Sequence, residues 1–250
     1  MELLIWLGFE VIFIVVHLFI NLIPISEQVG RVALSMYSQV FINIMAIWIF
    51  HKYLYKLNEK QFLGENFKCN LWSAIIGVGV CLGHRIFFLL FWNFTIQSME
   101  GIMQTGIDSQ VVFLNTIWGI LYITIMAPVT EEIFYRGIIF NTARKKHGNI
   151  YAVIVSSTLF AVAHMNGIQF ISALFMGIVI GYAIILTDNI YIGIIIHVAN
   201  NTFSLFNTNI LNKFWGNEDW QVYLQMTVGI ILLVIGIVML RREKKVVRKG

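Results

Sequence analysis

Three ionisable residues interrupt an apolar stretch near the middle of the chain. Residues 127–140 read APVTEEIFYRGIIF, which places Glu131, Glu132 and Arg136 among mostly hydrophobic neighbours. Glu132 and Arg136 are four residues apart with the acid first, which is the favourable order for an ion pair on one helical face. Glu131 points about 100° away from Glu132 around a helix. The spacing predicts that Arg136 neutralises Glu132, while Glu131 has no partner nearby in the sequence.

Two later apolar stretches carry further polar residues at helical spacing. The segment LFAVAHM places His164 four residues after Phe160, and IIHVANN places Asn201 four residues after His197. Each pair therefore lies on one face of its helix. A single histidine among apolar residues is commonly a packing residue, but ionisable groups inside a membrane usually mark function or pair with one another. Three separate stretches with polar pairs are harder to explain by packing alone.

Together these residues supply the parts of a peptide hydrolase. Glu131 is suited to act as the general base that takes a proton from water. His197 and Asn201 can donate hydrogen bonds to the negative oxygen that develops on the attacked carbonyl. A histidine or the protonated glutamate can then return a proton to the departing amine. The competing interpretation is that the two glutamates and Arg136 form a structural ion network between helices.

A metal ion offers a second kind of hydrolytic chemistry. Glu131, His164 and His197 match the ligand types of catalytic zinc sites. The chain has no H-E-x-x-H sequence, so these ligands would come from three different helices. We therefore favour a mechanism without a metal or other cofactor, and keep Zn²⁺ as the alternative.

The composition indicates that these residues belong to a membrane protein. Hydrophobic residues make up 58% of the 250 residues and charged residues 12%, against about a quarter charged in a typical soluble domain. We expect an all-α fold, a polytopic integral membrane bundle of about eight transmembrane helices in one domain, residues 1–250. The lipid bilayer is therefore one partner. No nucleic-acid partner is expected, because the net charge of +4 comes from lysines and arginines that flank the apolar runs.

Eight apolar runs are long enough to be considered as membrane spans. They cover residues 3–25, 32–50, 71–94, 111–126, 150–163, 168–186, 191–206 and 222–240. The fourth either continues through the two glutamates as one long helix or restarts at Pro128, since proline is well placed in the first turn of a helix. The first has neither a basic start nor a small-residue cleavage site, so we expect a membrane helix and not a cleaved signal peptide.

The basic residues predict the orientation of the chain. They gather between the second and third spans, in residues 144–146 between the fourth and fifth, and in the tail, residues 241–250. If eight spans alternate, these three groups fall on one side of the membrane. Because positive residues favour the inner side, both termini are predicted to lie in the cytoplasm. Counting along the spans then places Glu131, His197 and Asn201 within the membrane, nearer the cytoplasmic face, and places His164 deeper along its span.

Two further charged residues lie inside other predicted spans. Glu10 falls in the first span and Arg85 in the third. An unpaired charge at either place would be costly, so we expect the two to offset one another. Arg85 could instead bind a carboxylate of a substrate.

The polar residues resemble the signature of a known family. Their order and spacing are similar to the three motifs of the CPBP family, the CAAX proteases and bacteriocin-processing enzymes, also called the Abi family of intramembrane proteases. The matching motifs are Glu131-Glu132-x-x-x-Arg136, Phe160-x-x-x-His164 and His197-x-x-x-Asn201. The resemblance covers residues 127–206, about a third of the chain.

The resemblance implies an intramembrane endopeptidase with named residue roles. Glu131 and His164 would activate water, and His197 and Asn201 would stabilise the oxyanion. The supporting motif positions would be Glu132, Arg136 and Phe160. The substrate would be a membrane-associated or lipid-modified protein or peptide, since members trim prenylated proteins, mature peptides or bacteriocins, or act in self-immunity.

Two functions without catalysis stay open at this stage. The chain could be an immunity or binding protein that uses the polar cluster as a structural core. The presence of every expected catalytic residue favours activity over this alternative. A transporter fits less well, because the polar residues gather in one half of the chain and do not line two related repeats.

Overall fold

The computed structural model describes residues 2–22, 28–49, 70–83, 116–164, 167–206 and 219–247. These residues are almost entirely helical, and none of them lies in a strand. The prediction of an all-α fold is therefore confirmed. Arg85 lies outside the described residues, and nothing is described of the Glu10 side chain, so their pairing stays a prediction.

Each predicted span contains a described helical segment. The fourth predicted span is the start of a continuous helix, Ile117–His147, which we call the central helix. It consists of α7 (Ile117–Leu121), η2 (Tyr122–Met126), α8 (Ala127–Glu132), η3 (Ile133–Phe140) and α9 (Asn141–His147). The other helices are α1 (Glu2–Leu22), α2 (Gln28–Ile49), α4 (Leu71–Gly83), α10 (Asn149–Ala163), α11 (Gly167–Thr187), α12 (Ile190–Phe206) and α14 (Asp219–Val247).

Length and composition support a membrane crossing for four of these helices. They are α2 through Val32–Ile49, the central helix, α11 through Gln169–Thr187 and α14 through Trp220–Glu243. Shorter apolar helices, α4, α10 and α12, accompany them. The protein is therefore a helical membrane protein, while the number of about eight crossings stays a prediction.

The central helix passes through Pro128 without a break. Met126, Ala127 and Ile133 all keep right-handed helical backbone angles. The chain widens to π-helical geometry in η2, directly before the turn that contains Pro128, and again in η3. Wide turns of this kind are frequent at functional sites. Of the two possibilities left open by the sequence, the structure shows the continuous helix.

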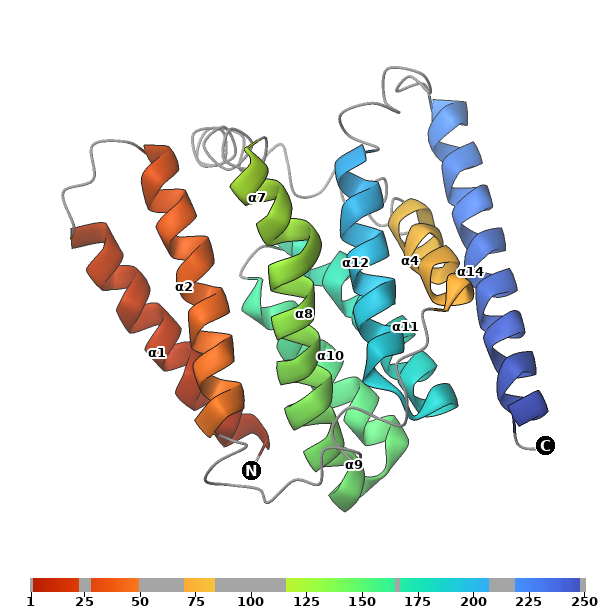
Figure 1. Cartoon of the computed structure of the whole chain (residues 1–250), viewed down its shortest axis with the longest axis horizontal. Coiled ribbons are helices and arrows are strands. Elements are labelled where there is room, and N and C mark those ends of the chain that lie inside the picture. Colours follow the sequence, from red (N-terminus) through yellow and green to blue (C-terminus); the bar gives the residue numbers. More distant parts are fainter. Residues whose placement is uncertain are drawn as a thin grey trace.

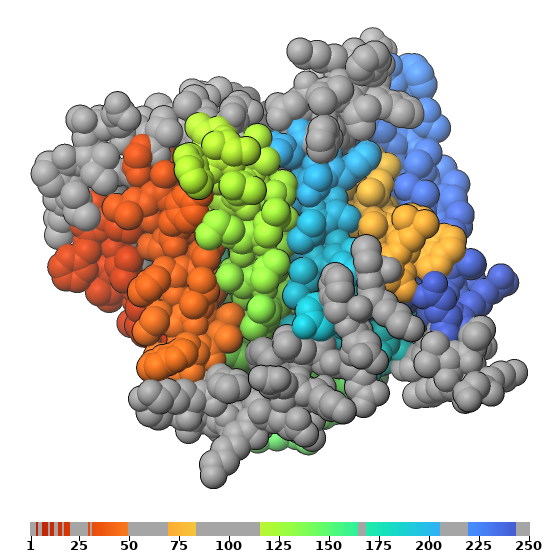
Figure 2. Space-filling view, viewed as in Figure 1, coloured from red at the N-terminus to blue at the C-terminus, as the bar shows by residue number. Residues whose placement is uncertain are grey.

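The central helix lies near the middle of the bundle (Figure 1). Figure 1 shows α1, α2, the central helix, α12, α4 and α14 following one another across one face, with α10 and α11 behind them. The same order is visible on the surface in Figure 2. The helix pairs in contact agree with this order, because α12 packs on the central helix and on α4, and α4 packs on α14. The site residues of the central helix, α10 and α12 are thereby brought to one region.

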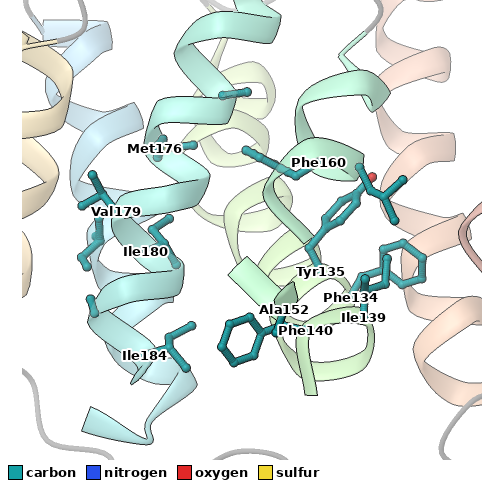
Figure 3. Packing of buried hydrophobic residues seen from close by; sticks show 14 of the residues in the cluster. Phe134, Tyr135, Ile139, Phe140, Ala152, Phe160, Met176, Val179, Ile180 and Ile184 are labelled. Carbon is teal, nitrogen blue, oxygen red and sulfur yellow. The ribbon is translucent and has the colours of Figure 1, made fainter. Parts of the chain in front are cut away.

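The most buried part of the central helix is η3. Every residue from Phe134 to Phe140 is buried, and the apolar side chains among them belong to one cluster with Phe160 of α10 and with Met176 and Ile180 of α11 (Figure 3). The outer faces of α1, α2 and α14 instead expose large apolar side chains. Lipid can cover such faces, so close packing and polar contacts hold membrane helices together more than the hydrophobic effect does.

Candidate active site

A buried ion pair forms the inner wall of the site. Glu132 Oε1 lies 3.2 Å from Nη1 of Arg136, and both side chains are fully buried. The pair predicted from the four-residue spacing is thus confirmed. The guanidinium also lies over the Phe160 ring, 4.7 Å from its centroid, where the negative face of the ring stabilises a cation.

Two glycines on neighbouring helices leave room for these charges. A Cβ atom at Gly193 of α12 would lie 3.3 Å from Glu132 Oε2, and one at Gly177 of α11 would lie 3.0 Å from Nη2 of Arg136. Side chains at these positions would press on the charged groups. Sequence reasoning did not single out either glycine, although Gly193 lies one helical turn before His197 and so shares its face.

His197 connects the two glutamates. Its Nδ1 lies 2.9 Å from Glu132 Oε1, and because a carboxylate only accepts hydrogen bonds, this nitrogen carries the proton. Its Nε2 lies 3.8 Å from Glu131 Oε2. The Glu131 side chain keeps 18% of its exposure, whereas that of Glu132 has none. Glu131 thus has a partner after all, on a different helix, and remains the more accessible of the two carboxylates.

The opposite charges of Arg136 and Glu132 offset one another, which lowers the cost of burying both groups. Glu131 lies beside this pair, because its Oε2 is 3.8 Å from Nε2 of His197. This separation allows an ion pair between Glu131 and His197 when His197 carries a second proton.

Phe160 contacts both site histidines. Its ring makes edge-to-face contacts with His164 at 4.8 Å and with His197 at 5.7 Å between ring centroids. His164 ends α10, and its Nδ1 lies 2.9 Å from the Phe160 carbonyl oxygen. A carbonyl only accepts, so Nδ1 carries the proton and Nε2 of a neutral His164 is free to accept one. Phe160 thus orients His164 through both its ring and its backbone.

Asn201 is held at both ends of its side-chain amide. Its Nδ2 donates to the carbonyl oxygen of Ile123 at 2.9 Å, and its Oδ1 accepts from Nδ2 of Asn200 at 3.0 Å. His197 contacts Glu131 and Asn201 contacts Ile123, so α12 runs antiparallel to the central helix. Sequence reasoning did not predict roles for Ile123 or Asn200, because a backbone carbonyl leaves no signal in residue type.

The predicted zinc ligands do not form a complete set. Within the described ranges, no group of three or more His, Cys, Asp and Glu side chains is placed to hold a metal ion. Glu131 and His197 are neighbours, but His164 is not grouped with them as a possible ligand among the described residues.

Comparison with known proteins covers this same part of the chain. Residues 113–203 match the family described as Type II CAAX prenyl endopeptidase Rce1-like. The predicted resemblance is thereby confirmed. We call residues 113–203 the Rce1-like segment, and it contains all of the predicted site residues.

Two curated bacterial proteins are similar to part of this chain. The chain is 35% identical over 105 residues to the membrane-embedded CAAX protease MroQ of Staphylococcus aureus (strain USA300), which covers 38% of this chain and 42% of that protein. It is 30% identical over 84 residues to the putative membrane peptidase YdiL of Bacillus subtilis (strain 168), with 34% of each chain covered. In each case, the part of the chain that matches covers less than half the length of the relative. No solved structure gives a significant match.

Proposed function

We propose that the chain is an intramembrane endopeptidase that hydrolyses a peptide bond with a water molecule activated by Glu131. The observation that carries this proposal is the continuous chain of contacts from Arg136 through Glu132 and His197 to Glu131. It supplies a base beside a proton donor within a segment similar to membrane proteases. If the ion network were only structural, it would not need a partly exposed member such as Glu131.

In the proposed mechanism, His197 carries a proton on both ring nitrogens and pairs with an ionised Glu131. Glu131 is then a carboxylate that takes a proton from water, and His164 Nε2 accepts a second hydrogen bond that orients the same water. The water oxygen attacks the peptide carbonyl. His197 Nε2 and the remaining N–H of Asn201 donate to the resulting oxyanion. Glu131 then gives its new proton to the departing amine, which breaks the C–N bond and restores the carboxylate.

The remaining residues would act through these four. Glu132 fixes the orientation of His197 by accepting from Nδ1, as carboxylates do for reactive histidines elsewhere. Arg136 holds Glu132, and Phe160 holds His164. These three are positioning residues in the proposed mechanism.

The proposed substrate is a membrane-associated or lipid-modified protein or peptide. The apolar surroundings of the site and the family resemblance both support such a substrate. We also propose that both termini, including the basic tail 241–250, face the cytoplasm. Thiol labelling from either side, at cysteines introduced in place of the exposed residues Lys145 and Trp220, checks this orientation.

The replacement Glu131→Gln tests the function directly. The amide keeps the size of the side chain but cannot act as a base, so we expect turnover to fall by about 100-fold to 10,000-fold. The measurement compares new peptide termini by mass spectrometry in membranes that contain wild type or variant, followed by cleavage of the identified peptide by purified protein. Glu243 is exposed, so Glu243→Gln serves as the matched control and should cleave normally.

Two results would decide against the proposal. Normal turnover by Glu131→Gln would remove this residue from the mechanism. A wild-type protein that retains a peptide but never yields a product would favour the non-catalytic immunity or binding protein.

A further inference from the structure

The Asn201 amide depends on one backbone carbonyl. The Ile123 carbonyl can only accept, so the group that faces it at 2.9 Å is the nitrogen and not the oxygen of the amide. With one N–H directed to Ile123 and the oxygen bonded to Asn200, the amide plane is fixed. A single N–H is left to donate elsewhere. The contact with Ile123 thus determines which way that N–H points.

The Ile123 carbonyl is available because two helical donors fail to reach it. In a regular α-helix it would accept from the N–H of Ala127, but that N–H donates to Tyr122 in the wide turn η2. In π-helical geometry the donor would be the next residue, which is Pro128 and has no N–H. The Ile123 carbonyl is partly buried, and a carbonyl shielded from water without a donor is costly, so a partner from outside the helix is favoured.

We propose that Pro128 is a positioning residue of the active site, because the donor it lacks leaves the Ile123 carbonyl to orient Asn201. This role rests on the proposed peptidase function. Pro128 is buried and lies three residues before Glu131, so one wide turn places the base and also frees the acceptor that holds an oxyanion donor. The other explanation is that the proline ring only stiffens the start of α8.

A backbone substitution separates these two explanations. Pro128→Ala restores an N–H that can bond to Ile123, and lactic acid at position 128 has the same methyl group but an ester oxygen in place of that N–H. If the missing donor matters, the alanine variant loses activity and the lactic acid variant keeps it. If the ring matters, both variants lose activity equally. Val129→Ala, one residue away and half-buried, is the control for general disturbance of the helix.

The expected result for Pro128→Ala is a lower kcat with an unchanged KM, because an oxyanion donor acts in the transition state and not in substrate binding. Losing one such donor typically costs about 100-fold to 1,000-fold, and misorienting it should cost at least about tenfold. The lactic acid variant and Val129→Ala should stay within about threefold of wild type. Unchanged turnover by Pro128→Ala, or equal loss in the alanine and lactic acid variants, would overturn the proposal.

A readout without substrate keeps this test apart from the proposed function. Nuclear magnetic resonance of protein labelled with ¹⁵N-asparagine reports the Asn201 side-chain amide, assigned by its disappearance in Asn201→Asp. This signal should move in Pro128→Ala and stay in place in the lactic acid variant and the control. If wild type cleaves nothing while the signal moves as expected, the peptidase function fails but the effect of Pro128 on Asn201 stands. If Pro128→Ala does not fold, a shifted Asn201 signal in the lactic acid variant would overturn the proposal and an unshifted one supports it.

Discussion

Glycine serves different purposes at two helix interfaces of this protein. Between α4 and α14, glycines bring backbone against backbone. A Cβ at Gly79 would lie 2.7 Å from the backbone nitrogen of Leu233, and one at Gly229 would lie 2.5 Å from that of Gly83. Such distances are too short for a real side chain, so these two helices can approach this closely only because the glycines are there.

Around the active site, glycines make room for charged side chains instead. A Cβ at Gly193 would meet the side chain of Ile180 at 2.9 Å and Glu132 Oε2 at 3.3 Å. A Cβ at Gly177 would meet Ser157 Cβ at 2.9 Å and the Arg136 guanidinium at 3.0 Å. The neighbours here are side chains, which can shift more easily than a backbone.

The two interfaces should therefore contribute differently to stability and to function. Membrane helices gain stability from close packing, and the contact between α4 and α14 is of this kind. The interface of the central helix, α10, α11 and α12 gives up close backbone packing to enclose an ion cluster that is costly to bury. Changes at the first interface should therefore reduce stability, while small changes at the second should mainly reduce activity.

Removing one charge from the cluster should have the largest effect on stability. Glu132→Ala leaves Arg136 without its ion partner, and Arg136→Ala does the same to Glu132. Each should lower the free energy of unfolding by about 3–5 kcal/mol, because an uncompensated buried charge remains. Unfolding in mixed micelles with increasing denaturing detergent measures this loss. The double replacement should cost less than the sum of the single ones.

An exposed ion pair provides the control for this cycle. Arg144 on α9 pairs with Asp188 between α11 and α12, but the Asp188 side chain keeps 68% of its exposure. Arg144→Ala should change stability by less than about 1 kcal/mol. Strictly additive losses for the Glu132 and Arg136 variants would show that the two residues do not interact.

An added methyl group between α4 and α14 should have the next largest effect. Gly79→Ala forces the two backbones apart, and overpacking of this kind costs about 1–3 kcal/mol. Gly8→Ala on α1 is the control, since a Cβ there meets nothing within 4 Å and alanine favours a helix. Turnover per folded molecule should be unchanged in both. A stable Gly79→Ala variant that has lost activity would contradict the separation of the two interfaces.

Local patterns were enough to predict most of the helices and part of the site. Apolar runs mark membrane helices directly, so each predicted span contains a described helix. The Glu132–Arg136 pair was predictable because both residues lie on one helix, one turn apart. The sequence left open whether one helix continues through Pro128 or a new one restarts there, because that depends on whether another segment satisfies the freed carbonyl. Asn201, 78 residues away from Ile123, does so.

Contacts between different helices could not be predicted from local sequence patterns. The bond from His197 to Glu132 joins residues 65 positions apart, and its existence depends on how α12 and the central helix are aligned. That alignment is set by all packed side chains together and by Gly193, which leaves room for Glu132. A single glycine in an apolar run does not indicate such a role in the sequence. His164 was expected to act beside Glu131. The structure links it to Phe160, so its role in activating water stays a prediction.

The smallest predicted change tests the second interface most sharply. Gly193→Ala adds one methyl group next to Ile180 and Glu132 Oε2, and alanine's helix preference of about 1 kcal/mol offsets the crowding. Stability should therefore change by less than about 1 kcal/mol. Turnover should still fall by up to about tenfold, because a displaced Glu132 carries His197 with it, and small misplacements of reacting groups slow catalysis. Gly181→Ala is the matched control, since the three atoms nearest its Cβ would all belong to Val153, the first at 3.1 Å. Equal losses of turnover in both variants would mean that crowding on either helix, and not the position of Glu132, limits the reaction.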